Sequence, residues 1–117
     1  MKIKLATVFS GIGAIEFALK RLNIEHEIVF ACDNGERVIT YDIETQREIV
    51  RNLETIDDKR RYVDNLYEGQ TKSKNYVEQS YLANYGKNIS EDDFHLDINL
   101  LDGTDYRNKV DLLVGGS

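Results

Sequence analysis

Compact apolar runs alternate with longer amphipathic stretches along the chain. The apolar runs fit buried strands of a few residues each. We predict strands over residues 2–9, 27–31, 93–98 and 110–114. The first two runs end in turn-forming residues, Ser10 to Gly13 and Cys32 to Gly35.

Helical spacing follows the first of these turns. Ile15, Leu19 and Leu22 recur at intervals that place them on one face, so a helix is expected from Gly13 to Leu22. The long stretch after the second turn is charged and irregularly amphipathic. It predicts one helix from residue 43 to 56, a turn near residues 68–70, a second helix through residues 77–82 and a stop at Gly86 in the left-handed conformation.

The alternation of strand and helix predicts an α/β fold with a parallel, Rossmann-like sheet. Residues 1–117 are expected to form one domain or part of one, with a helical insertion at about 37–80 that is too long for a simple crossover. If the first strand lies beside the last, residues 110–114 form an exposed apolar edge through which the chain can self-associate.

Composition narrows the possible functions. The net charge of −6 is unfavourable for a chain that binds DNA by itself, because duplex affinity comes largely from Lys and Arg. No apolar run reaches the length of a membrane span, and the first residues lack the pattern of a signal peptide, so no membrane association and a cytoplasmic location are expected. One cysteine and two separated histidines predict neither a disulfide nor a metal site.

The turn after the first strand is the first candidate ligand site. Open parallel sheets bind ligands at the carboxyl ends of their strands, and glycines there let the backbone approach the ligand. The candidate residues are Phe9, Ser10, Gly11, Ile12 and Gly13. An ordinary tight turn is the alternative. Glu16 stands where the third glycine of a dinucleotide fingerprint would be, which disfavours NAD.

Two carboxylates are expected at the same edge of the sheet. Asp33 ends the second predicted strand, where an acid can accept hydrogen bonds from a ribose diol, and Asp97 ends the third, where it can accept from the amine of adenine. Each can instead cap a turn or a helix. Asp111 is expected to be a structural partner at the entrance of the last strand, and Cys32 a small buried side chain rather than a nucleophile.

Several segments together resemble the DNA cytosine-5 methyltransferase family. Residues 7–19, Thr-Val-Phe-Ser-Gly-Ile-Gly-Ala-Ile-Glu-Phe-Ala-Leu, look like its first motif, and Asp33 falls on its acidic second motif. Residues 81–86 resemble the approach to the third motif, where Asp97 and Ile98 fall, and residues 110–117 resemble the strand that leads into its catalytic Pro-Cys-Gln. The family often has Asp at position 7, usually Glu at position 33 and commonly Trp at position 34.

The resemblance implies the fold and the activity of an S-adenosylmethionine-dependent methyltransferase. In that family a cysteine thiolate adds to C6 of a flipped cytosine, and C5 then takes the methyl group. The nucleophile is expected just after Ser117, so this portion carries no catalytic residue and should be inactive alone; DNA would be bound by regions outside it. A bacterial restriction-modification system is the implied origin. The resemblance assigns S-adenosylmethionine to Phe9, Ser10, Gly11, Ile12, Gly13, Asp33, Asn34, Asp97, Ile98 and Gly116.

Three other interpretations remain open. The chain can be one subunit of a split methyltransferase, or a non-catalytic Rossmann-like module that holds another nucleotide. It can also be a structural or inhibitory remnant without a ligand. In that last case the basic run Lys59-Arg60-Arg61 would be a partner surface, whereas the simpler interpretation of the run is a solvated helix face.

Overall fold

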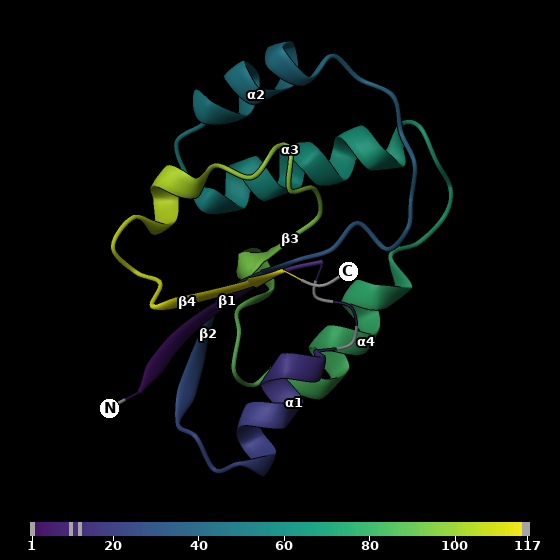
Figure 1. The fold of residues 1–117 in the computed structure, drawn as a ribbon. Helices are drawn as coiled ribbons and strands as arrows, with labels where there is room; N and C mark the ends of the chain where they lie inside the picture. Colours follow the sequence, from purple (N-terminus) through teal and green to yellow (C-terminus); the bar gives the residue numbers. More distant parts are fainter. Residues whose placement is uncertain (1, 10, 12, 116–117) are drawn as a thin grey trace.

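The computed structural model describes residues 2–9, 11 and 13–115. These residues form four strands, four α-helices and two short 3₁₀ helices (Figure 1). In chain order they are β1 (Ile3–Val8), α1 (Ala14–Arg21), β2 (His26–Cys32), α2 (Ile43–Arg51), α3 (Ile56–Glu68), α4 (Tyr76–Tyr85), η1 (Glu91–Asp93), β3 (Phe94–His95), η2 (Gly103–Tyr106) and β4 (Leu112–Gly115).

The four strands make one parallel sheet in the order β3-β2-β1-β4. Strand β1 is central, and it pairs with β2 from Ile3 opposite His26 and with β4 from Leu5 opposite Leu112. The predicted α/β class with a parallel sheet is confirmed, and the sheet with its flanking helices is consistent with a Rossmann-like fold. The predicted neighbour relation between the first and last strands is also confirmed.

Helices cover the sheet on two sides (Figure 1). Helices α1 and α4 lie together on one side, while α2 and α3 lie on the other. The larger buried cluster draws side chains from β2, β3 and helices α2, α3 and α4, and the smaller one joins Ala6, Phe30 and Tyr106. Burial of these apolar side chains is the main favourable contribution to folding.

Helix α1 is held against α4 by buried polar contacts. Glu16, at the position where a dinucleotide-binding helix carries glycine, is fully buried and accepts a hydrogen bond from the Tyr81 hydroxyl. The Tyr85 hydroxyl donates to the Gly13 carbonyl at 2.9 Å. A Cβ on Gly13 would lie 2.3 Å from the Tyr85 ring, and the backbone there has φ +89°, so packing and conformation both require glycine.

Three predicted features are wrong in detail. The stretch 43–56 is not one helix: α2 ends at Arg51, and Thr55 caps a new helix by accepting a hydrogen bond from the Asp58 N–H. Strand β3 is shorter than residues 93–98 and ends at His95, so Asp97 lies in the loop beyond it. Gly86 follows α4 with φ −61°, a right-handed conformation that lets its N–H donate to the Leu82 carbonyl at 2.7 Å.

The predicted insertion divides into two parts. Helices α2 and α3 form a separate layer above the sheet, whereas α4 begins inside the predicted range but packs with α1.

Asp111 lies at the entrance of β4, as predicted, and accepts a hydrogen bond from the Lys4 N–H at 3.0 Å. Among the described residues, no helix is long and apolar enough to cross a membrane.

The basic run at the start of α3 is not a solvated face as a whole. Lys59 is buried and pairs with Asp102 at 3.0 Å and with Asp105 at 2.8 Å. Arg60 pairs with Glu78 at 2.8 Å and donates to the Phe94 carbonyl. Arg61 alone of the three is exposed. Two of the three cations therefore fasten α3 to neighbouring segments.

Candidate functional site

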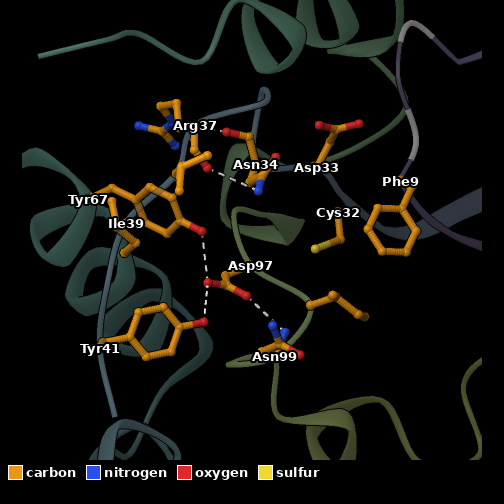
Figure 2. Close-up of a pocket in the computed structure, with 12 residues that line it drawn as sticks. Phe9, Cys32, Asp33, Asn34, Arg37, Ile39, Tyr41, Tyr67, Asp97 and Asn99 are labelled. Carbon is orange, nitrogen blue, oxygen red and sulfur yellow. Dashed lines mark hydrogen bonds between the residues drawn. The ribbon is translucent and has the colours of Figure 1, made fainter. Parts of the chain in front are cut away.

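A pocket of about 360 Å³ opens at the carboxyl ends of β1, β2 and β3 (Figure 2). This volume is in the range of small-molecule sites, which begin at about 300 Å³. Its lining residues are Phe9, Cys32, Asp33, Asn34, Arg37, Val38, Ile39, Tyr41, Tyr67, Asp97, Ile98 and Asn99. The pocket thus lies where a parallel sheet is expected to bind a ligand.

Phe9 is an exposed aromatic side chain at this pocket. It follows β1 directly, the residue is 57% exposed, and its backbone has φ 52°. A bulky residue with positive φ is rare because its Cβ crowds the backbone, at a cost of about 1 kcal/mol or more. Figure 2 shows the ring beside Cys32, facing the pocket. An aromatic surface is therefore presented to the pocket instead of being buried in the core.

Asp33 organises the two loops that border the pocket. One carboxylate oxygen accepts from the Gly11 N–H at 2.9 Å, and the other accepts from the Gly35 N–H at 2.8 Å. Its carbonyl accepts from the Asn75 side chain at 2.8 Å, which ties the loop to the start of α4. Since a carboxylate offers about four acceptor sites, each oxygen of Asp33 can still accept one more hydrogen bond.

Asp97 is a buried carboxylate in the floor of the same pocket. One of its oxygens accepts hydrogen bonds from the hydroxyls of Tyr41, at 2.6 Å, and Tyr67, at 2.7 Å. The other accepts from the Asn99 N–H at 2.9 Å. Burial, together with the hydrogen bond to Asp97, raises the pKa of Tyr41 to about 12 and raises that of Tyr67 further. Both tyrosines therefore stay protonated and act as donors at neutral pH.

Arg37 lies over the face of the Tyr67 ring. Its guanidinium carbon lies 4.5 Å from the centre of the Tyr67 ring, and its Nε donates to the Asn34 carbonyl at 3.0 Å. The side chain is buried, and one terminal nitrogen has no hydrogen-bond partner among the described residues. A cation over an aromatic face is a favourable contact that holds both groups in place.

Cys32 lines the pocket without the character of a nucleophile. Its side chain is 2% exposed, and burial, reinforced by the negative charges of Asp97 and Asp33, raises the pKa of the thiol far above its usual value. The reactive form of cysteine is the thiolate, so this residue is inert at neutral pH. The prediction that Cys32 is a small buried side chain is confirmed.

The structure brings five of the predicted site residues into one pocket: Phe9, Asp33, Asn34, Asp97 and Ile98. Gly11 and Gly13 are not among its lining residues; the first donates to Asp33 and the second packs under Tyr85. Ser10, Ile12 and Gly116 lie outside the described residues.

The sequence did not reveal the contributions of Arg37, Tyr41, Tyr67 and Asn99 to this pocket. Tyr67 belongs to the buried face of α3, so its spacing in the sequence predicts that its side chain is buried. The spacing does not predict that its hydroxyl donates to a carboxylate 30 positions away. A signal was present for the contact with Asn99, because an Asp side chain often accepts a hydrogen bond from the backbone N–H two residues on, as Asp97 does here from Asn99.

Among the described residues, no group of three or more His, Cys, Asp or Glu side chains could hold a metal ion. Comparison of the chain with protein-family models, with curated proteins and with solved structures gave no match. The function must therefore be argued from the pocket itself.

Proposed function

We propose that this chain is the S-adenosylmethionine-binding portion of a DNA cytosine-5 methyltransferase. The observation that carries the proposal is the pocket that gathers Phe9, Asp33 and Asp97. These residues were selected from the sequence by their resemblance to three separate motifs of that family. Convergence of the three on one edge of a parallel sheet supports a shared ligand more than any single motif does.

The residues of the pocket suit an adenosyl group. Asp33 has acceptor capacity left for the hydroxyls of a ribose, and Asp97 can accept from an exocyclic amine. Phe9 and Ile98 offer apolar surfaces that can flank a purine ring. Asn34 stands where the family commonly has Trp, so Phe9 is the one aromatic side chain among the five predicted site residues that line this pocket.

The bound cofactor would supply the methyl group, while the residues of this chain would bind and orient it. The proposal places the nucleophilic cysteine beyond residue 117, since Cys32 is buried and inert. It also assigns DNA binding to regions outside this chain, in keeping with the net charge of −6. The same proposal includes a role in a bacterial restriction-modification system. It also includes a location in the cytoplasm, where bacterial DNA lies.

A titration with S-adenosylhomocysteine, NAD and ATP tests the proposal. We expect S-adenosylhomocysteine to bind most tightly in isothermal calorimetry. Phe9→Ala should weaken this binding by about 5- to 150-fold, because stacking of a base on an aromatic ring contributes about 1–3 kcal/mol. Phe17→Ala is the matched control, since Phe17 is equally exposed, at 55%, but lies on α1 and does not line the pocket.

Two results would contradict the proposal. Tighter binding of NAD or ATP than of S-adenosylhomocysteine would favour a different nucleotide-binding module. Absence of binding to all three ligands by a folded chain would favour a protein without a nucleotide ligand.

A further inference from the structure

Residues 37–67 contribute one whole wall of the pocket. Five lining residues come from this segment: Arg37, Val38, Ile39, Tyr41 and Tyr67. Tyr41 lies in the extended stretch before α2, and Tyr67 lies in the last turn of α3. Figure 2 shows both hydroxyl groups directed at the same oxygen of Asp97. The helical segment therefore reaches the ligand pocket through two tyrosines.

The hydrogen bonds of Asp97 leave it with little acceptor capacity. Two hydroxyl donors fill one oxygen, and the Asn99 N–H takes one acceptor site on the other. Of the roughly four acceptor sites that a carboxylate offers, about one remains. The three donors come from separate segments, so the plane of the carboxylate is fixed as well as its position.

We propose that Tyr41 and Tyr67 are positioning residues that make the pocket selective for a 6-aminopurine nucleoside over a 6-oxopurine nucleoside. This inference rests on the proposed function, because it concerns the base of the ligand held there. A fixed carboxylate with one remaining acceptor site matches a 6-amino donor. A 6-oxo oxygen would instead face the Asp97 carboxylate, and two acceptors cannot form a hydrogen bond. Two facing oxygens without a hydrogen bond would be costly in a buried site.

Rigidity is the source of the selectivity. A 6-oxopurine carries a donor at the neighbouring N1 position, and a carboxylate that can turn would reach it. The two tyrosines prevent this turn, and Tyr67 is itself held by the Arg37 guanidinium over its ring. Loss of the hydroxyls should therefore reduce the discrimination between the two bases more than it reduces affinity for the preferred one.

The test compares S-adenosylhomocysteine with S-inosylhomocysteine in calorimetric titrations of the wild-type chain, Tyr41→Phe, Tyr67→Phe and the double variant. We expect the wild type to prefer the amino ligand by about 100-fold or more, as sites built around a hydrogen bond do. In the double variant the ratio of dissociation constants should fall by about tenfold or more, which corresponds to the loss of a hydrogen bond to a charged group.

Tyr62→Phe is the matched control. Tyr62 lies on the same helix as Tyr67, but its hydroxyl donates to Gln46 outside the pocket, so its loss should leave the ratio unchanged. Tyr41 is half-buried rather than fully buried, so Tyr41→Phe gives a folded single variant even if the double variant unfolds.

The outcomes separate the two proposals. A wild type that binds neither ligand contradicts the proposed function. A wild type that binds S-adenosylhomocysteine but does not discriminate, or a Tyr41→Phe variant that keeps the full wild-type ratio, overturns the assignment of the tyrosines and leaves the proposed function standing.

Discussion

At the scale of single residues, His95 makes the stability of the fold depend on pH. The residue is 8% exposed, and its Nε2 lies 2.6 Å from the Tyr106 hydroxyl. Because Tyr106 donates its own proton to Asp93, the nitrogen must be the donor in this contact. Burial, with a smaller contribution from the positive charge of Arg60 and against the opposing effect of Asp105, lowers the pKa of His95 from 6.5 to about 4.

The sign of the pH effect follows from this lowered pKa. As the pH falls from 7 to 4, the unfolded chain binds a proton at His95 before the folded chain does, so the free energy of unfolding decreases. The decrease in the free energy of unfolding that this residue causes should approach about 3 kcal/mol at pH 4. Urea unfolding of the wild type and of His95→Gln at pH 7 and pH 4 measures it. Equal losses in both proteins would contradict the prediction.

Residue types at strand ends were predictable, whereas the partners of their side chains were not. Phe9 and Asp33 follow strands that are visible as apolar runs, so their place at the carboxyl edge could be derived from the sequence. Tyr41 and Tyr67 could not be assigned in this way, because a pattern of burial does not tell which polar atom a tyrosine hydroxyl will meet. That contact depends on the path of the segment between β2 and α4.

At the scale of elements, a buried ion cluster fastens α3 to η2. Lys59 lies between Asp102 and Asp105, and although burial alone would lower its pKa, its hydrogen bonds to the two acids raise it. Lys59→Met should destabilise the fold by about 3 kcal/mol or more, because two nearby acids lose their counter-charge. Arg61→Met removes an exposed pair with Asp57 and should change stability by less than about 1 kcal/mol. Urea unfolding at pH 7 compares them, and similar midpoints for the two variants would refute the expectation.

The elements differed in how far the sequence predicted them. Strands β1 and β2 are contiguous apolar runs bounded by turns, and their predicted positions agree with the structure. Strand β3 was overestimated because Leu96 is as buried as a strand residue although the chain has left the sheet. The predicted helix over residues 43–56 extended beyond α2, which ends at Arg51, and α3, which begins at Ile56, was not predicted. The Thr55 cap was a local signal of the start of α3.

At the scale of the whole molecule, β4 lies at the edge of the described sheet beside β1. Leu113 on this strand is 60% exposed, and an apolar edge can pair with a second copy of the chain. We expect the chain to associate with increasing concentration in sedimentation velocity experiments, and Leu113→Lys to reduce this association. Leu22→Lys is the control, because Leu22 is 69% exposed at the end of α1 and away from the sheet edge. Equal effects of the two variants would indicate general apolar adhesion instead of edge pairing.

The tyrosines of the α2–α3 segment bear on how this molecule can change in evolution. Deleting the segment would remove two of the three donors that satisfy the Asp97 carboxylate and would leave a buried oxygen without a partner, a costly intermediate. The segment and the acid are therefore mutually dependent: neither can be lost singly without a penalty. In any lineage that loses residues 37–67, Asp97 must be replaced in the same step, or its carboxylate must gain hydrogen-bond donors from another segment.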